Sequence, residues 1–127
     1  MATKTVEFQN TAGHQLAARL ELPVDQHPGA FAVFAHCFSC NKNLNAIRAI
    51  SRALTSRGFG VLRFDFTGLG ESDGDFADTN FTSNVDDLVA ACGYLREEHV
   101  APALIVGHSL GGAAALFTAA HVDEIQA

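Results

Sequence analysis

Near the C-terminal end of the sequence, a glycine, a serine and a second glycine stand at alternate positions, as Gly107, Ser109 and Gly111. The apolar run 103–106 precedes them directly, and the alanine-rich segment 112–120 follows. This order predicts a strand that turns sharply into a helix, with the serine at the turn. A Cβ on either glycine would collide with the strand or the helix, and the strained serine projects its hydroxyl clear of the sheet. We therefore expect Ser109 to be a nucleophile.

A serine held in this way attacks an ester or a similar carbonyl, and preorganised backbone donors stabilise the oxyanion that forms. One expected donor is the N–H of Leu110, which follows the nucleophile at the positive end of the predicted helix. His108 completes the predicted elbow and is expected to be a packing or polar-network histidine rather than the general base. The alternative interpretation is a glycine-rich helix start with an incidental serine.

Strand-like and helix-like segments alternate before the elbow and must position it. Residues 5–9 and 15–22 surround a turn signal and predict an N-terminal hairpin. The apolar segments 30–35 and 60–64 predict further strands, of which the first is expected to be buried on both faces, like the strand before Ser109. This arrangement predicts an α/β fold, with a hairpin followed by a mostly parallel sheet flanked by helices. Loops at the carboxyl ends of the parallel strands then build the site.

Two helices are predicted between these strands. The first is indicated by apolar residues at helical spacing: Leu44, Ile47, Ile50 and Leu54. Gly58 supplies its stop signal. The second is predicted from about residue 84 to residue 98, with Ser83 and Asp86 as a capping box. Its predicted apolar stripe consists of Val85, Leu88, Val89, Cys92 and Leu95.

The composition excludes several classes of function. A length of 127 residues suits one domain, residues 1–127, and the 48% hydrophobic and 17% charged content is typical of a globular protein. The formal net charge of −6, with no run of lysine or arginine, argues against nucleic acid as a partner. The first residues contain no apolar core of the signal-peptide type, no later apolar stretch is long enough to cross a bilayer, and the three cysteines are an odd number. We therefore expect a cytoplasmic protein with no membrane partner.

The order of these motifs resembles the α/β-hydrolase superfamily over nearly the whole chain. The resemblance rests on residues 36–38, 63–72 and 107–112 with the strands and helices between them. Within the superfamily, residues 34–40 (FAHCFSC) and 63–70 (RFDFTGLG) are most similar to the hydrolase half of bacterial fusions with an OsmC-like peroxidase domain. The resemblance implies a serine hydrolase of carboxylic esters or related acyl compounds that needs no cofactor.

The resemblance also implies roles for residues outside the elbow. The N–H of Phe38 would be the second oxyanion donor. The family usually has His-Gly in this loop, whereas this chain has His36 and Cys37, so the backbone path there is expected to differ. By the same resemblance His36 shapes this loop and Asp65 anchors loops, and neither is expected to be catalytic.

Two members of the expected catalytic triad lack candidates in the chain. In this fold an acid and then a histidine follow the serine. Only His121, Asp123 and Glu124 follow Ser109 with suitable side chains, and twelve helical residues would place His121 about 18 Å along the axis. We therefore interpret the chain as an incomplete hydrolase domain (a fragment, a truncated gene product or a deliberately short form) with little or no activity alone. Its last predicted strand would have an open edge, which favours self-association or pairing with another chain.

Two alternatives from other classes remain. The chain is either such an enzyme or a non-catalytic interaction module, for example an accessory to an OsmC-like domain, and the missing triad members favour the second. Cys37 and Cys40 form a C-x-x-C that would allow thiol redox chemistry. No metal site is expected, because no second cysteine pair completes a tetrahedral set of ligands.

Overall fold

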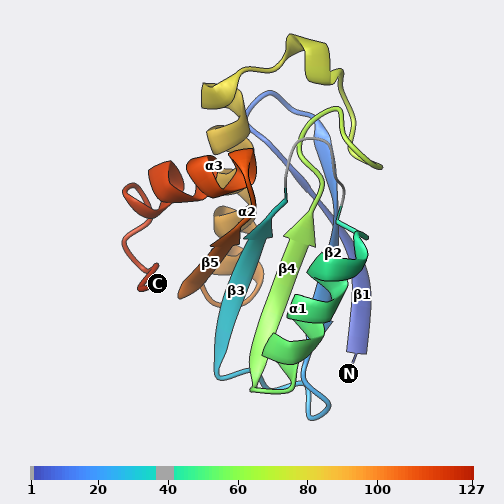
Figure 1. Cartoon of the computed structure of the whole chain (residues 1–127), viewed down its shortest axis with the longest axis vertical. Coiled ribbons are helices and arrows are strands. Elements are labelled where there is room, and N and C mark those ends of the chain that lie inside the picture. The colour runs from blue at the N-terminus through green and yellow to red at the C-terminus, as the bar shows by residue number, and fades with distance from the viewer. Residues whose placement is uncertain (1, 37–41) are drawn as a thin grey trace.

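The computed structural model describes residues 2–36 and 42–127. Its described part contains one mixed five-stranded sheet with strand order β1-β2-β4-β3-β5 (Figure 1). The strands are β1 (Ala2–Gln9), β2 (Gln15–Leu22), β3 (Ala30–Ala35), β4 (Phe59–Phe64) and β5 (Leu104–Gly107). β1 and β2 form the predicted hairpin and β2 pairs antiparallel with β4, whereas β3 pairs parallel with both β4 and β5. The parallel half of the sheet therefore carries the ends of β3, β4 and β5 to one edge.

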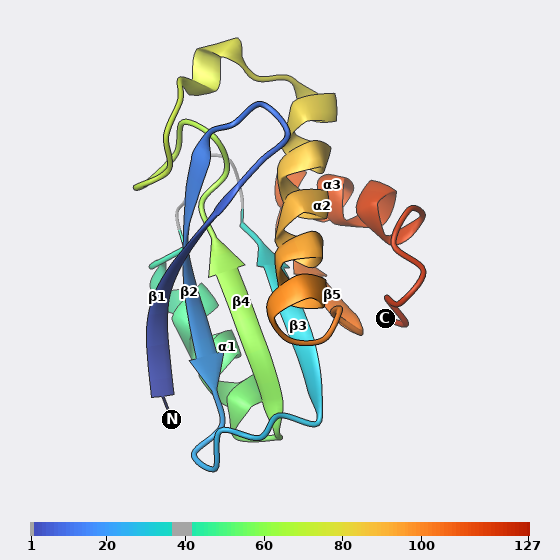
Figure 2. The same ribbon diagram turned by 180° about the vertical axis from the view of Figure 1, so that it is seen from behind.

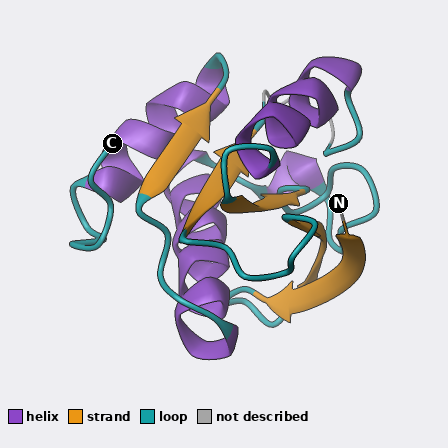
Figure 3. Ribbon diagram, turned by 90° about the horizontal axis from the view of Figure 1, so that it is seen from below, coloured by secondary structure: helices purple, strands orange, loops and turns teal. Residues whose placement is uncertain are grey.

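The helices cover the sheet on both faces. They are α1 (Asn45–Thr55), α2 (Phe81–Glu98) and α3 (Leu110–Ala119), with a short 3₁₀ helix η1 (Phe76–Asp78) before α2. α1 lies across β4 and β2 on one face (Figure 1), and α2 and α3 lie on the other (Figure 2). Helices on both sides of the strands are also visible from below (Figure 3). The α/β fold expected from the sequence, a partial α/β-hydrolase arrangement, is confirmed. No helix within residues 2–36 and 42–127 is long and apolar enough to cross a membrane.

The main core lies between the sheet and the helices α2 and α3. The Phe8 ring packs on Phe64 and Tyr94 with centroid separations of 5.8 and 5.6 Å, which joins the hairpin to β4 and α2. Cys92 is fully buried on α2, and burial raises the pKa of its thiol to about 12. It is therefore a small apolar core residue, as predicted.

The start of α2 differs from the prediction. The helix begins at Phe81, and its N-cap is Asn80, whose side chain accepts a hydrogen bond from the N–H of Ser83 at 2.8 Å. The Ser83 hydroxyl accepts in return from the N–H of Asn80 at 2.9 Å, so the capping box is Asn80 with Ser83, not Ser83 with Asp86. Val89 is 38% exposed and does not belong to the buried stripe.

The buried face of α1 also differs from the prediction. Ile47, Ser51 and Thr55 are buried, whereas Leu44 and Ile50 are 40% and 42% exposed. The reason is the surface beneath the helix, because the adjoining side chains of β2 and β4 include Glu21 and Arg63. The predicted glycine stop is confirmed, since Gly58 follows the helix with φ +90°.

β5 is the last strand at its end of the sheet, so residues 104–106 are only half-buried and Gly107 is exposed, whereas the sequence predicted a strand buried on both faces. The final residues of the chain lie along its outer edge. The Ala127 N–H donates to the Ala103 carbonyl at 3.2 Å, and the Ala127 carbonyl accepts from the Ile105 N–H at 3.0 Å. This reciprocal pattern pairs Ala127 with Leu104 in the parallel sense.

Candidate active site

Ser109 occupies the turn between β5 and α3. It is the N-cap of α3 with φ 58° and ψ −123°, a conformation that is sparsely populated by residues with a Cβ. The side chain is exposed. The preceding residue, His108, donates its N–H to the Ala35 carbonyl at 3.0 Å, so pairing between β5 and β3 continues up to the turn. The sheet therefore holds one side of the strained residue and the helix holds the other.

The two flanking glycines of the predicted elbow have no room for a side chain. A Cβ on Gly107 would lie 2.5 Å from the Cα of Gly112, and a Cβ on Gly111 would lie 2.3 Å from the carbonyl oxygen of His36. Gly112 differs, because the nearest atoms would be 3.6 Å from its Cβ. Close backbone packing at Gly107 and Gly111 therefore requires glycine, as the spacing predicted.

Some of the backbone N–H groups that follow Ser109 have hydrogen-bond acceptors and others do not. Gly111 donates to the His108 carbonyl at 3.0 Å, and Gly112 donates to the Ser109 carbonyl at 2.8 Å. Leu110 is the first residue of α3, where an N–H has no intrahelical acceptor. Within the described ranges no hydrogen bond uses this N–H or the Ser109 hydroxyl. The Leu110 N–H thus remains available at the N-terminal end of α3.

The polar residues after the elbow have local partners. His121 lies two residues beyond α3, and its Nδ1 is 2.8 Å from the Phe117 carbonyl oxygen. Glu124 binds the Arg96 guanidinium through two hydrogen bonds of 2.8 Å, which lower the pKa of its carboxyl to about 2. The described contacts do not bring either residue to Ser109.

The other predicted oxyanion donor, Phe38, lies outside the described residues, as do Cys37 and Cys40. His36 is described and is almost fully buried, with its ring edge-on to Phe66 at a centroid distance of 5.3 Å. Its Nε2 lies 3.4 Å from Oδ1 of Asp65. His36 therefore has a buried carboxylate partner and is enclosed in the fold.

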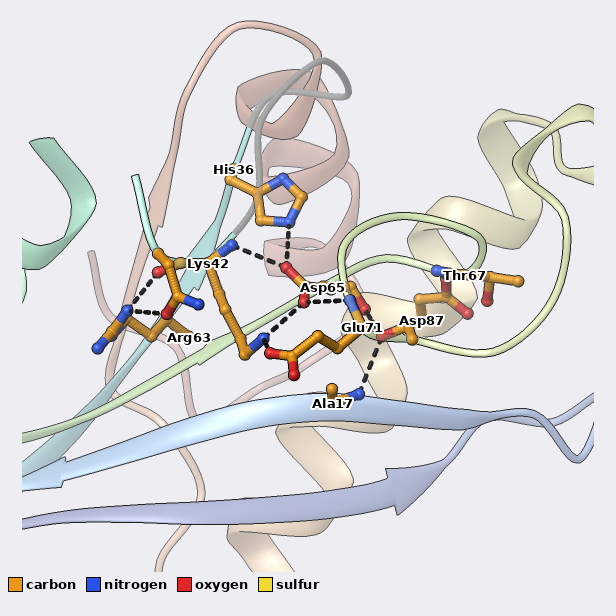
Figure 4. A network of polar contacts seen from close by, with 10 residues as sticks. Ala17, His36, Lys42, Arg63, Asp65, Thr67, Glu71 and Asp87 are labelled. Carbon is orange, nitrogen blue, oxygen red and sulfur yellow. Dashed lines mark hydrogen bonds and ion pairs between the residues drawn. The ribbon is translucent and has the colours of Figure 1, made fainter. Parts of the chain in front are cut away.

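Asp65 is the centre of a buried polar network at the carboxyl end of β4 (Figure 4). Oδ1 accepts a hydrogen bond of 2.7 Å from the Lys42 N–H, and Oδ2 accepts one of 2.8 Å from Lys42 Nζ. With His36 on the same carboxylate, Asp65 contacts the residues on either side of segment 37–41. We call this group, Asp65 with His36, Lys42 and Glu71, the Asp65 clamp.

Glu71 closes the clamp on the side of the loop after β4. Its N–H donates to Asp65 Oδ2 at 3.0 Å, and its carboxylate accepts from Lys42 Nζ at 2.7 Å. Gly70 between them has φ +52°, and a Cβ there would lie 2.3 Å from Asp65 Oδ2. Burial by itself would raise the pKa of Asp65, but hydrogen bonds from His36, Lys42 and Glu71 hold it well below its usual range.

The resemblance anticipated that Asp65 anchors loops, but nothing in the sequence singled out Lys42. Lysine is rarely buried without a charged partner, and Lys42 is only 2% exposed. Its partners lie 23 and 29 residues further along the chain, so no local pattern connects them.

A second aspartate fixes the loops from the other side. Asp87 on α2 accepts hydrogen bonds from Asn10 Nδ2 at 3.0 Å and from the Thr67 N–H at 2.8 Å. These bonds tie the hairpin turn and the loop after β4 to α2. Across the described ranges, no group of three or more histidine, cysteine, aspartate or glutamate side chains is arranged to hold a metal ion.

Comparisons with known proteins agree with this geometry. Residues 26–127 match the family model described as serine aminopeptidase, S33. The esterase domain from a Rhodothermus marinus protein is 54% identical, with a TM-score of 0.79 over 98% of this chain and 49% of that one. Est1E from Butyrivibrio proteoclasticus, solved with ferulic acid bound, is 25% identical, with a TM-score of 0.86 over 94% of this chain and 49% of that one.

The Pyrococcus furiosus esterase Pf2001 is 23% identical and shares the fold, with a TM-score of 0.85 over 98% of this chain and 46% of that one. No curated protein matches the sequence. The chain spans about half the length of these solved relatives. Because the family match extends over most of its residues, the chain belongs to the serine aminopeptidase S33 family of α/β hydrolases.

Proposed function

We propose that this chain is the nucleophile-bearing part of a serine hydrolase that acts on carboxylic esters or related acyl compounds, with Ser109 as the nucleophile. One observation carries the proposal: Ser109 has φ 58° at a strand-to-helix turn whose flanking Gly107 and Gly111 have no room for a Cβ. The 54% identical esterase domain from a Rhodothermus marinus protein supports the substrate class.

In the proposed reaction, Ser109 Oγ attacks the carbonyl carbon of the substrate and loses its proton to a general base. The substrate oxygen becomes an oxyanion, which accepts hydrogen bonds from preorganised donors. The available N–H of Leu110 supports its role as one donor. The N–H of Phe38 is proposed as the second, on the basis of the family resemblance.

We further propose that the acid and the histidine of the triad come from outside these 127 residues. The ring of His36 is buried against Asp65 and Phe66, and His121 has the Phe117 carbonyl as its partner. His108 lies within the elbow itself and is proposed to be structural. The chain alone should then show little turnover, because a serine without its base retains only a small part of its catalysis.

The test is covalent labelling by a fluorophosphonate, which reacts with activated serines. Labelling should occur at Ser109 when the acid and histidine are present in the full-length natural protein, and the 127-residue chain should react little. Ser109→Ala should abolish labelling, whereas Ser56→Ala, at an exposed serine after α1, should not affect it. Full labelling of the Ser109→Ala variant would disprove the assignment.

A second candidate function, a non-catalytic interaction module, is favoured by the position of β5 as the last strand at its end of the sheet, where residues 126 and 127 cover only part of its outer edge. Such a module would pair with a second copy or with another chain, such as the OsmC-like domain that the resemblance implies. Sedimentation of the 127-residue chain distinguishes the outcomes. A monomer at all concentrations tested, together with Ser109 labelling of the full-length protein, would argue against this second function.

A further inference from the structure

Four of the eight cationic side chains gather in one cleft on the face of the sheet that α1 covers. The cleft has a volume of about 390 Å³ and is lined by Arg19, Arg48, Arg52 and Arg63. Thr3, Glu21 and Asn43 complete its walls. We refer to it as the arginine cleft. The sequence contains no run of basic residues, so only the fold creates this cluster.

The register of the sheet and the turn of α1 bring the arginines together. Arg19 on β2 stands directly opposite Arg63 on β4. Arg48 and Arg52 are one helical turn apart, so their side chains leave α1 on the same face. Like charges directly opposite each other on neighbouring strands destabilise a sheet. An anion between them would remove this repulsion.

The charges within the arginine cleft do not balance. Glu21 is the only carboxylate among the described residues of its lining, and it accepts a hydrogen bond of 2.8 Å from Arg63 Nη2. This leaves a formal excess of three positive charges, although the whole chain has a net charge of −6.

Donor groups in the arginine cleft also lack acceptors. Arg63 is only 5% exposed, and although Asn43 accepts from its Nη1 at 3.1 Å, its Nε has no acceptor among the described residues. The buried Nε of Arg19 likewise has no acceptor within residues 2–36 and 42–127. Arg19 Nη1 donates to Thr5 Oγ1 at 2.8 Å. Both Nε atoms are covered in this structure, so an anion in the cleft would be bound by the exposed guanidinium groups of Arg48 and Arg52 rather than by these donors.

We propose that the arginine cleft binds a small phosphate-bearing anion. Guanidinium groups present a planar fork of donors that matches phosphate oxygens, and every cation in the lining is arginine rather than lysine. Among the described residues the lining has no aromatic or large aliphatic side chain, which argues against an acyl chain or a stacked base as the main contact. The excess of three positive charges favours a multivalent anion over a single carboxylate. The site is separate from the proposed esterase chemistry and does not depend on it.

The first experiment titrates the full chain with pyrophosphate, inorganic phosphate and acetate at constant ionic strength, with calorimetry as the readout. Constant ionic strength is needed because salt screens exposed charges. Pyrophosphate should bind more tightly than phosphate, and acetate should not bind measurably. Equal binding of acetate and pyrophosphate would overturn the phosphate class, and no binding of any of them at millimolar concentration would overturn the site.

The second experiment uses exposed arginines, whose substitution should leave the fold intact. Arg48→Gln and Arg52→Gln should each weaken pyrophosphate binding by about tenfold or more, which is the usual effect of losing one charge-assisted hydrogen bond. Arg57→Gln is the matched control, because Arg57 is exposed just after α1, carries the same charge and does not line the cleft. An equal loss of affinity in Arg57→Gln would show attraction by general charge and refute the site.

Discussion

The elbow around Ser109 and the Asp65 clamp are two neighbouring parts of the site that are built in opposite ways. The elbow requires glycine, which has no side chain, at positions 107 and 111, because a Cβ there would overlap the backbone. The clamp depends on charge, since it pairs a fully buried carboxylate with a buried ammonium.

His36 contacts both parts, through its carbonyl oxygen at Gly111 and its ring at Asp65. Ser109 is therefore held by steric exclusion, whereas His36 and Lys42, on either side of segment 37–41, are held electrostatically. The two parts should therefore respond to different perturbations.

The largest effect is expected from Asp65→Asn. This change leaves the ammonium of Lys42 buried with Glu71 as its remaining carboxylate partner, and breaking a buried ion pair costs about 3–5 kcal/mol of unfolding free energy. Urea denaturation measures the loss. Asp86→Asn, at an exposed aspartate of α2, is the control and should change stability by less than about 0.5 kcal/mol. Equal stability of the two variants would contradict the role of the clamp.

Gly111→Ala tests the steric side of the comparison. The new Cβ would meet the carbonyl oxygens of His36 and Ala35 at 2.3 and 2.4 Å, and overpacking of this kind destabilises by about 1–3 kcal/mol. Gly112→Ala is the matched control, because there is room for its Cβ and alanine favours a helix by about 1 kcal/mol over glycine. Thermal denaturation should show a lower Tm for Gly111→Ala and an unchanged or higher Tm for Gly112→Ala. If both variants lose stability equally, close packing at Gly111 is not the cause.

Acid should weaken the clamp before it affects the packing of the elbow. The pKa of Asp65 is lowered in the folded state, so its stabilising effect is complete above the unfolded pKa of about 4. The effect is lost as the pH falls through the folded pKa, with a slope of at most about 1.4 kcal/mol per pH unit from this group. Denaturation of the natural sequence measured from pH 6 down to pH 2 should show no change from this group above about pH 4 and this slope below it. The slope should be shallower in Asp65→Asn, and identical slopes would contradict the prediction.

The smallest expected effect is a gain of stability at Ser109. Ser109→Gly removes the Cβ that makes φ 58° unfavourable, and after the entropy that glycine adds to the unfolded state we expect a net gain of about 1 kcal/mol. Ser109→Ala keeps the Cβ and should not share this gain. Chemical denaturation of the two variants side by side separates strain at the backbone from loss of the hydroxyl. Equal stabilities would show that the serine is not strained.

The sequence by itself determined the elements and the form of the elbow. All five strands and the helices α1 to α3 lie where alternation, helical spacing and glycine signals predicted them, because such signals depend on near neighbours along the chain. The predictions of where α2 begins and of which face of α1 is buried were wrong. Asn80 has the extended backbone of an N-cap and takes that position instead of Ser83. The buried face of α1 packs on a polar surface that exists only once the sheet has formed.

The tertiary structure alone decided which charged residues meet. Lys42 binds Asp65, which lies 23 residues further along the sequence. Arg19 stands opposite Arg63 because β2 pairs with β4. No local pattern encodes such a contact, because it depends on strand order and register. The strained turn at Ser109 is therefore predictable from five consecutive residues, whereas the clamp and the arginine cleft exist only once distant strands have paired.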